Sequence, residues 1–484
     1  MLPAVRIKTL VDRPPYTAGQ YVLYWMTAFR RLQWNFALDH AVGWCRELRR
    51  PLLILEALEC DYPWASDRIH RFVLEGMAEN RERARKAGVA YHAYVEPRPG
   101  AGRGLLRALA RRACVVVSDD YPCFFLPAIS RAAAKQLRVR FELVDSNGLL
   151  PLRAAGRAFD RAFSFRRFLQ RNLPERLEQM PLARPFARLR MRATNVPQGI
   201  AQRWPAASNQ SLRADRAALE RLPINHNVGA APLRGGTEAA RKTLRTFLAQ
   251  KLATYDEKRN HPDVDASSHL SAYLHFGHIS THEVFSELMR RERWSPARLA
   301  LRPSGSREGW WGVKPAAEAF LDQVVTWREL GFNFCVHRGD YAAYDSLPAW
   351  ARRTLAKHAR DERAYRYTLE QLEKAQTHDR LWNAAQRQLS SEGWLHNYMR
   401  MLWGKKILEW TRRPRQALAF MIELNNKYAL DGRDPNSYSG ILWCLGRYDR
   451  PWGPERPTFG TVRYMSSENT GRKLRLRAYL MKYA

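Results

Sequence analysis

The sequence has little cysteine, and its cysteines are not spaced like a metal-binding or disulfide framework. Six cysteines are spread over 484 residues without a CxxC pair, which argues against a zinc ribbon or a disulfide scaffold. No apolar run approaches the roughly 18 residues of a membrane span. The first fifteen residues lack the apolar core of a signal peptide, so we expect a cytoplasmic protein, nucleoid-associated in a bacterium, with no membrane partner.

Acidic residues are scarce relative to basic ones. The chain has 47 Asp and Glu against 80 Lys and Arg, a formal net charge of +33. This excess favours a nucleic-acid partner, although an arginine-rich codon bias would produce the same imbalance. With 45% hydrophobic and 26% charged residues, the composition is that of a globular protein. The length suggests two or three domains.

Short apolar runs alternate with helical patterns in the first 145 residues. This alternation is typical of an α/β fold with a doubly wound parallel sheet, whose ligands bind at the carboxyl ends of the strands. Strands are predicted at 21–26, 51–58, 91–95, 114–118 and 141–144, and helices at 36–48, 68–87 and 105–112.

The rest of the chain has few strand signals. Residues 146–220 are rich in Arg, Pro and Ala, and we interpret them as a connector with short helices. Residues 221–484 are helical in pattern, with loops rich in Pro, Gly and Asn. Helices are predicted at 237–258, 285–292, 315–330, 347–358, 384–389, 396–410 and 414–425.

Three local motifs in the first 300 residues have a structural interpretation beside a functional one. The glycines of 100–104 follow no strand and lack the third glycine of a dinucleotide site, so a tight loop is favoured. Ser118, Asp119 and Asp120 are better explained as a cap at a strand end than as ligands. His275, His278 and His282 share one helical face, but Gly277 interrupts it and no carboxylate completes a metal site.

Hydroxyl groups gather in 267–271, just before a helical pattern. Ser267, Ser268 and Ser271 would offer hydroxyls beside unpaired backbone amides, which favours a phosphate there. A simple N-cap cluster explains the same residues equally well.

Aromatic residues are abundant toward the carboxyl end. Trp403 and Trp410 are seven residues apart on a predicted helix, and with Trp382 they would form either a row for electron transfer or an ordinary aromatic core. The segment 431–443 combines acidic residues with Trp443 and would suit a pocket for a flat heterocycle. Farther on, arginines alternate with aromatic residues, as expected of a nucleic-acid surface or of a loop with arginines lying along it. These arginines are Arg447, Arg450, Arg456 and Arg463.

Over essentially its whole length the chain resembles the DNA photolyases, and among them the class II cyclobutane pyrimidine dimer photolyases. The resemblance is strongest from residue 240 onward. It also includes GLLPLRA (148–154) and SFRRFL (164–169). The segments that carry it are SSHLSAYLHFGHIS (267–280), KAQTHDRLWNAAQ (374–386), HNYMRMLWGKKILEW (396–410), LNNKYALDGRDPNSYSGILW (424–443) and DRPWG to RYM (449–465).

The resemblance implies a flavoprotein with two parts. One is an α/β, Rossmann-like antenna domain (1–145), and the other, after the connector (146–220), is an all-helical domain (221–484) that holds one non-covalent FAD and binds DNA. Such enzymes flip a pyrimidine dimer out of UV-damaged DNA and split it with an electron from light-excited reduced FAD. We expect this protein to act as a monomer without an obligate protein partner. A deazaflavin is the suggested antenna chromophore, with a folate or flavin as alternatives.

The same resemblance assigns roles residue by residue. Tyr255, Ser267, Ser268, Leu270 and Ser271 match the FAD phosphate segment, and Arg400 and Asp431 match an ion pair beside the flavin ring, with Asn425 facing its N5. Trp327 and Trp443 match the walls that hold the dimer, and Met401 its thioether contact. Trp403, Trp382 and Trp410 match an electron chain from the flavin to the surface. Arg259, Asn260, Arg450 and Trp452 match DNA-binding positions.

Two departures from the family pattern bear on function. The pocket glutamate that binds the dimer carbonyls is replaced by Gln323, which cannot supply a charge or a proton. Residues 26–31 read MTAFRR where class II enzymes read closer to MSRDQR, a difference that bears on the antenna site. Gln323 favours an alternative function, a cryptochrome-like blue-light photoreceptor with weak or no repair. A non-catalytic DNA-binding flavoprotein is a third hypothesis.

Overall fold

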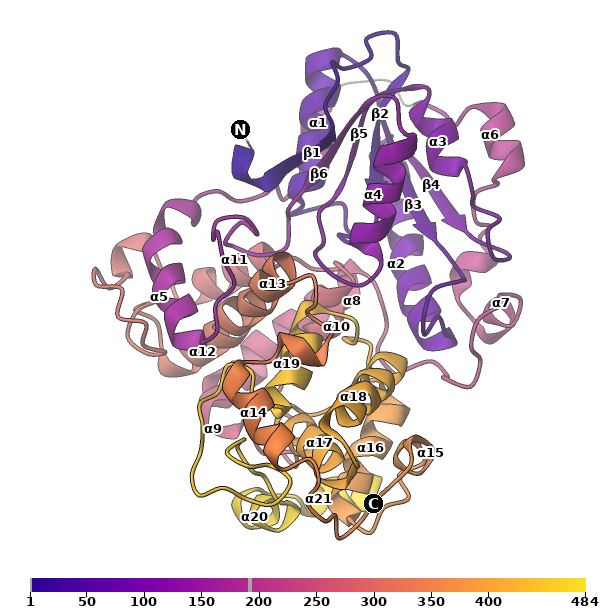
Figure 1. The fold of residues 1–484 in the computed structure, drawn as a ribbon. Coiled ribbons are helices and arrows are strands. Elements are labelled where there is room, and N and C mark those ends of the chain that lie inside the picture. The colour runs from indigo at the N-terminus through magenta and orange to yellow at the C-terminus, as the bar shows by residue number, and fades with distance from the viewer. Residues whose placement is uncertain (1, 190–193) are drawn as a thin grey trace. The chain divides into compact units, whose positions relative to one another are not determined.

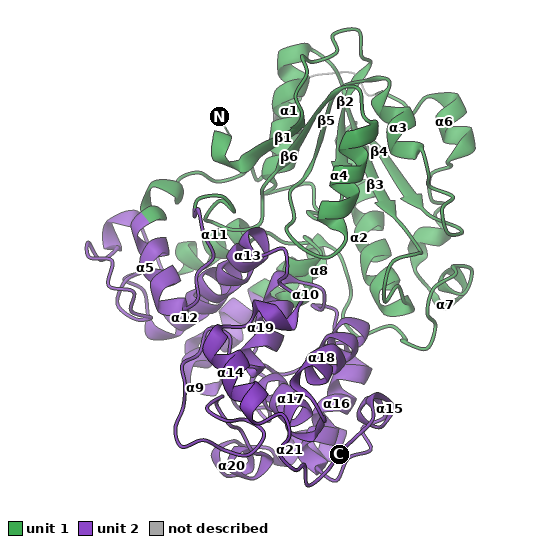
Figure 2. Ribbon diagram, viewed as in Figure 1, with its two compact units in different colours: residues 1–154, 172–244, 270–291 green, residues 155–171, 245–269, 292–484 purple. Residues whose placement is uncertain are grey.

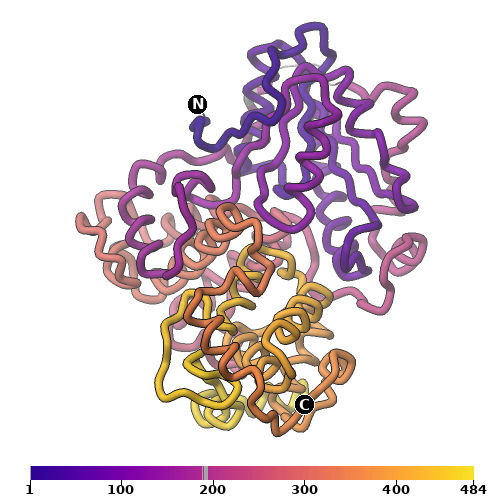
Figure 3. Tube along the Cα trace, in the orientation of Figure 1, coloured from indigo at the N-terminus to yellow at the C-terminus, as the bar shows by residue number. Residues whose placement is uncertain are grey.

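The computed structural model describes residues 2–189 and 194–484, which form two compact units (Figure 2). Unit 1 comprises residues 1–154, 172–244 and 270–291, and unit 2 comprises 155–171, 245–269 and 292–484. Figure 3 follows the chain from indigo to yellow and shows the last third of it folded within unit 2. The predicted domain limits at 145 and 220 stay a prediction.

Unit 1 contains a six-stranded sheet in the order β1-β6-β5-β2-β3-β4. All neighbouring strands are parallel except β1, which pairs antiparallel with β6 at the edge. The five predicted strands are confirmed, and β1 is an addition that the sequence analysis missed. The strands are β1 Ile7–Val11, β2 Tyr21–Met26, β3 Leu52–Leu58, β4 Ala90–Val95, β5 Ala113–Asp119 and β6 Arg140–Val144.

Helices cover both faces of this sheet, as a doubly wound fold requires (Figure 1). Tyr21, on one face of β2, donates its hydroxyl to the Leu109 carbonyl of α3 at 2.8 Å. Tyr24, on the other face, accepts a hydrogen bond from Asn35, the N-cap of α1, at 2.9 Å. The helices of this part are α1 Phe36–Leu48, α2 Asp67–Lys86, α3 Leu105–Ala110, α4 Leu126–Gln136, α6 Gln198–Arg203, α7 Arg216–Leu219, α8 Thr237–Thr246, α10 Ser271–His275 and α11 Thr281–Arg291.

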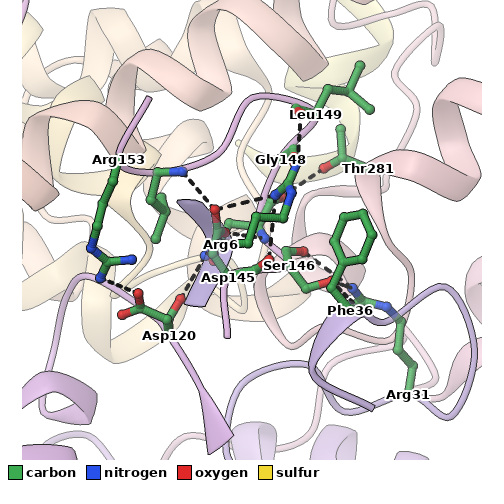
Figure 4. A network of polar contacts seen from close by, with 12 residues as sticks. Arg6, Arg31, Phe36, Asp120, Asp145, Ser146, Gly148, Leu149, Arg153 and Thr281 are labelled. Carbon is green, nitrogen blue, oxygen red and sulfur yellow. Dashed lines mark hydrogen bonds and ion pairs between the residues drawn. The ribbon is translucent and has the colours of Figure 1, made fainter. Parts of the chain in front are cut away.

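A buried polar network ties the start of unit 1 to the carboxyl end of β6 (Figure 4). Arg6 is fully buried, pairs with Asp145 at 3.3 Å and donates to the Leu149 carbonyl at 2.7 Å. Ser146, next in the chain, accepts from Arg31 at 3.2 Å. Because removing one partner of a buried charge pair costs several kcal/mol, this network fixes where the chain leaves the sheet.

Unit 2 is helical, as predicted. Two predicted long helices, 237–258 and 315–330, are interrupted by π-helical turns at Phe247–Lys251 and Asp322–Trp327, a feature frequent at functional sites. The helices are α5 Ala162–Asn172, α9 Tyr255–Lys258, α12 Pro315–Leu321, α13 Arg328–His337, α14 Ala349–Lys357, α15 Leu369–Glu373, α16 Arg380–Glu392, α17 Asn397–Trp410, α18 Pro414–Tyr428, α19 Pro435–Cys444, α20 Ser467–Lys473 and α21 Arg477–Tyr483. Both units also contain short 3₁₀ turns. In unit 1 they lie at Ala4–Arg6, Pro174–Arg176, Pro185–Arg188 and Ser211–Arg213, and in unit 2 at Leu252–Thr254, Pro296–Arg298 and Tyr344–Ser346.

Candidate functional site

Helix α17 forms the centre of the candidate site. It packs against α16, α18 and α19 and carries Arg400, Met401, Trp403 and Trp410. Gly404 permits the close approach of α19, because a Cβ atom at this position would lie 2.5 Å from the sulfur of Cys444. The packing of α17 therefore brings together side chains from segments that are distant in the sequence.

Arg400 and Asp431 form the ion pair that the resemblance implies. The Arg400 guanidinium donates to both carboxylate oxygens of Asp431, at 2.9 and 3.2 Å. Both side chains are mostly buried. A fixed cation beside an acid suits the polar edge of a flat heterocycle.

Asn425 lies on α18 and is almost completely buried. Its amide nitrogen donates to the Ser437 hydroxyl at 2.5 Å and to the side-chain oxygen of Asn426 at 3.3 Å. These bonds hold the amide in one orientation. A residue that hydrogen-bonds to one particular atom of a bound ring requires such a fixed orientation.

The predicted phosphate segment contains a charged cluster that the sequence analysis missed. Asp265 pairs with Lys251 and His269, at 2.6 Å each. Burial opposes ionisation of Asp265, but the hydrogen bonds from His269 and Lys251 prevail and lower its pKa to about 2. Asp265 and His269 flank Ser267 and Ser268 in the sequence, and both serines are half-buried. Leu270 and Ser271 begin the next segment of unit 1.

Two buried residues of unit 2, Tyr255 and His396, fit an anionic, aromatic cofactor. Tyr255 is buried edge-on against Phe247 and Phe320, with ring centroids 5.5 and 5.6 Å away. His396 is 3% exposed, and neither ring nitrogen forms a hydrogen bond of normal geometry with a described residue. Burial lowers its pKa to about 4, although the nearby Arg259 backbone favours the protonated form, so at neutral pH the ring is neutral and carries one donor and one acceptor.

The three tryptophans of the predicted chain are connected. The indole of Trp382 donates to the Trp403 carbonyl at 3.0 Å, and its ring lies 5.5 Å from that of Trp410. Trp403 in turn donates to the Gln386 side chain at 2.9 Å. The expectation that Trp410 ends this row at the surface is wrong, because its side chain is only 2% exposed. Tyr367 and His378, which precede α16, and Lys406 of α17 pack around its ring.

Further aromatic residues lead from Trp410 to the solvent. The Trp410 ring lies 5.3 Å from Tyr367 and 5.4 Å from His378. Tyr365 stacks on His378 at 3.6 Å and is 49% exposed. The row therefore reaches the surface through residues that the sequence analysis did not select.

Trp327 is held by Asp322, the residue that precedes Gln323. Its indole donates to Asp322 at 3.1 Å, and Arg166 donates to the other carboxylate oxygen at 2.9 Å. Gln323, in the same π-helical turn, is half-buried and forms no side-chain hydrogen bond with a described residue. Its amide is thus available to a ligand.

Two cations lie near the Trp443 ring. The ammonium of Lys405 is 4.9 Å from the centroid of its ring, and the guanidinium of Arg463 is 5.9 Å from the same centroid. Lys405 is completely buried and donates to the Cys444 carbonyl at 2.7 Å. Met401 is one helical turn before Lys405. The sequence alone gave no signal for Lys405.

The loop after α19 exposes one aromatic side chain between basic groups. Trp452 is 38% exposed and donates its indole N–H to Asp449 at 2.9 Å. The guanidinium groups of Arg450 and Arg463 each lie 5.0 Å from its ring. This combination suits a surface that meets phosphates and bases.

One arginine of the predicted nucleic-acid surface belongs to the interior. Arg447 is 2% exposed and lies over the Phe334 ring at 3.8 Å, so interpreting it as a DNA contact was wrong. Arg450, Arg456 and Arg463 are exposed as expected. Arg259 is half-buried above the Tyr255 ring, and Asn260 follows it.

The structural interpretations of the two motifs in unit 1 are confirmed. In the glycine loop, the Gly102 amide donates to the Glu96 carboxylate at 2.9 Å. A carboxylate of the protein itself therefore binds this amide, where a dinucleotide site would bind a phosphate. Asp119 accepts from the amides of Thr27, Ala28 and Phe29 within 2.9 Å and caps the segment after β2. That segment is part of the predicted departure from the antenna pattern.

The three histidines of 275–282 contact different partners. His278 accepts from the Gly236 amide at 3.0 Å, His282 lies against Phe36, and His275 against Phe276. Across the described ranges, no group of three or more His, Cys, Asp or Glu side chains is placed to hold a metal ion. Within those ranges, too, no helix has the length and apolar character needed to cross a membrane.

Comparisons with known proteins show the family to which the chain belongs. No protein-family model matches the chain. It is 35% identical over 481 residues to a deoxyribodipyrimidine photo-lyase of Methanothermobacter thermautotrophicus, covering 99% of this chain and 98% of that protein. Proteins of the same name from Oryza sativa and Potorous tridactylus are 33% and 31% identical, over 96% and 94% of this chain and 87% and 80% of their own lengths.

A solved structure supports the fold. A class III photolyase from Agrobacterium tumefaciens superposes with a TM-score of 0.68 at 17% identity, covering 96% of this chain and 86% of that one. An α/β unit with a doubly wound sheet and a helical unit are thus confirmed as the fold class. The chain belongs to the photolyase/cryptochrome family, and its curated relatives are named deoxyribodipyrimidine photo-lyases.

Proposed function

We propose that this protein is a class II photolyase that repairs cyclobutane pyrimidine dimers in DNA under blue light. The observation that supports this most is the packing of α17, which carries Arg400, Met401 and Trp403, against α18 with Asn425 and α19 with Trp443. Residues assigned to the cofactor edge, to the dimer contact and to the tryptophan row thus share one helix.

The residues present fit one non-covalent FAD. In the proposal, Tyr255, Ser267 and Ser268, with Leu270 and Ser271 following in the chain, hold its phosphates, and the buried, neutral His396 offers an additional polar contact. The Arg400–Asp431 pair holds the polar edge of the ring, and Asn425 fixes a proton position at N5. When bound and reduced, the flavin would supply the electron that splits the dimer.

The remaining roles belong to binding and positioning of the dimer. Trp327 and Trp443 sandwich the flipped-out pair, Met401 contacts it, and Gln323 offers one donor and one acceptor to its carbonyl and N3–H groups. Arg450 and Trp452 fill the gap left in the duplex, and Arg259 and Asn260 contact the nearby strand. Trp410, Trp382 and Trp403 conduct electrons toward the cofactor and keep it reduced, with Tyr365 as the exposed end of the row.

The antenna and the assembly state belong to the same proposal. A deazaflavin or another chromophore would bind the α/β part, and the protein would act as a monomer on UV-damaged DNA. A protein with this much positive charge and no strong sequence readout depends on phosphate contacts for affinity.

Repair by the purified protein tests the proposal. The protein is reconstituted with FAD, chemically reduced and illuminated at blue wavelengths with oligothymidine that contains a dimer. We expect one FAD per chain and loss of the dimer only in the light. A preparation that takes up no FAD contradicts the cofactor assignment. A flavin-loaded protein without repair contradicts the photolyase function and leaves the cryptochrome-like photoreceptor, which the neutral Gln323 favours.

A further inference from the structure

Lys405 is a charged residue at a position where an apolar one would be expected. Its side chain has no exposure to solvent, and no carboxylate among the described residues forms an ion pair with it. Its ammonium has one hydrogen bond, to the carbonyl of Cys444 at the end of α19. Burying an ammonium costs several kcal/mol. The charge of Lys405 therefore needs either nearby negative charge that compensates this cost or a function that explains it.

The compensation within the protein is partial. The Cys444 carbonyl belongs to the last turn of α19, where unpaired carbonyls carry partial negative charge. Asp449 adds a longer-range attraction, and Arg463 opposes it. The net result is a pKa lowered to about 8 by burial, so the group still carries a proton at neutral pH.

The ammonium faces an aromatic ring that has a role in the proposed site. It lies 4.9 Å from the centroid of Trp443, within the range of a cation–π contact, and Arg463 adds a second cation near the same ring. Gln323, which belongs to the other proposed side of the pocket, is neutral and adds no anion. Two cations thus lie near the Trp443 ring, against one carboxylate, Asp449, that acts on Lys405.

We propose that Lys405 is an electrostatic positioning residue of the lesion pocket, which acts through Trp443 to stabilise the negative charge that the pyrimidine dimer carries during repair. The inference rests on the proposed photolyase function. The dimer gains one electron from the reduced flavin, the two bonds that join its bases break, and the electron returns. No net oxidation occurs, and Lys405 keeps its proton throughout. A fixed charge in a dry site acts without reorganisation at the moment of reaction.

Three variants separate charge from shape. Lys405→Met removes the charge and keeps an unbranched side chain that is one atom shorter, and Lys405→Arg keeps the charge. Lys406→Met is the matched control, because it makes the same change one residue along, where the lysine pairs with Glu409 at 3.0 Å and faces Trp410 instead of Trp443. All proteins carry FAD and are chemically reduced, so that the tryptophan row does not limit the result.

The measurements are repair yield per absorbed photon, the dissociation constant for dimer-containing DNA in the dark, with and without FAD, and the melting temperature. For Lys405→Met we expect a repair yield about tenfold lower and a dissociation constant within about twofold of wild type. Lys405→Arg restores most of the yield, and Lys406→Met leaves it unchanged. In the wild type, the yield falls as pH rises through about 8, while in Lys405→Met it does not.

Each outcome is decisive. An unchanged yield in Lys405→Met, or a loss fully explained by weaker dark binding, overturns the role of Lys405 while wild-type repair leaves the photolyase function intact. If Lys405→Arg fails to fold, a wild-type yield without a pH step near 8 overturns the role by itself. A wild type that repairs nothing overturns both the function and this inference.

Discussion

Trp327 donates its indole N–H to Asp322 at 3.1 Å, and Asp322 receives the Arg166 guanidinium on its other oxygen. Asp322 is 6% exposed, and Arg166 comes from α5, more than 150 residues earlier in the chain. A proposed wall of the lesion pocket is thus oriented by a buried ion pair. This relationship leads to the first prediction.

Asp322→Asn should loosen this wall and destabilise the protein. The amide retains one acceptor but presents a donor to either Arg166 or Trp327, which leaves a buried cation without its partner. Removing one member of a buried pair costs about 3–5 kcal/mol. We expect a clearly lower melting temperature and weaker binding of dimer-containing DNA.

The control for this change is Asp340→Asn. Asp340 pairs with Arg338 at 2.7 Å, but both side chains are more than one third exposed, so the loss should stay below about 1 kcal/mol. Equal effects of the two substitutions on dimer binding would contradict the assignment of Trp327 as a pocket wall.

Trp403→Phe should block photoreduction of oxidised FAD and leave repair by the chemically reduced protein largely intact. The indole row would supply electrons to the cofactor and not to the dimer. The variant also leaves the Gln386 oxygen without its donor, at a cost of about 1–3 kcal/mol in stability. Photoreduction is followed by the loss of flavin absorbance under blue light with an external reductant.

Trp310→Phe is the matched control, because Trp310 is also buried but packs against Trp311, outside the row. We expect its photoreduction to equal that of the wild type. Normal photoreduction in Trp403→Phe would show that electrons enter by another route.

Arg450→Ala should weaken binding of dimer-containing DNA by about tenfold and of undamaged DNA by less. Arg450 stacks on the exposed Trp452, and the pair would be needed only after the dimer has left the duplex. Binding of both DNAs should fall steeply with salt, because several phosphates are contacted. Titrations at several salt concentrations measure both effects.

Arg472→Ala provides the comparison, since it removes an exposed arginine that pairs with Glu468 on α20. It should change the two affinities equally and slightly. The same proportional loss for both DNAs in Arg450→Ala would reduce this residue to a general phosphate contact.

Gln323→Glu should raise the repair yield without tightening binding. The wild-type amide already offers a donor and an acceptor to the dimer, but it cannot transfer or share a proton with it. Lost polar stabilisation costs about 10²–10³ in rate at well-studied sites, and we expect a smaller factor here, up to about tenfold. Repair yield and dissociation constant are compared under the same light.

Gln323→Leu is the third protein in this comparison. It removes both hydrogen-bonding groups of the amide and keeps a side chain of similar volume. It should bind the dimer more weakly than the wild type. If neither the wild type nor Gln323→Glu repairs dimers, the photolyase function fails.

Much of the fold followed from local patterns. The limits of β2 and α1 agree with the prediction to the residue, because a continuous apolar run and a capped amphipathic helix are encoded within a few neighbouring residues. Strand β1 was missed because Ile7–Val11 is short and half-exposed, and it pairs with β6, which lies 130 or more residues farther along the chain. Local patterns do not contain that pairing.

The sequence by itself determined the alternation of the first half, the helical second half, the basic charge and the residue types of the candidate site. Those properties depend on composition, periodicity and short motifs. The tertiary structure decided which of these side chains are buried and which face each other: Trp410 and Arg447 turned out to be interior, Asp322 holds Trp327, and Lys405 lies under Trp443. The physical reason is that burial and charge pairing arise between segments that are distant in the chain, and a side chain's exposure and its electrostatic partners depend on what packs against it.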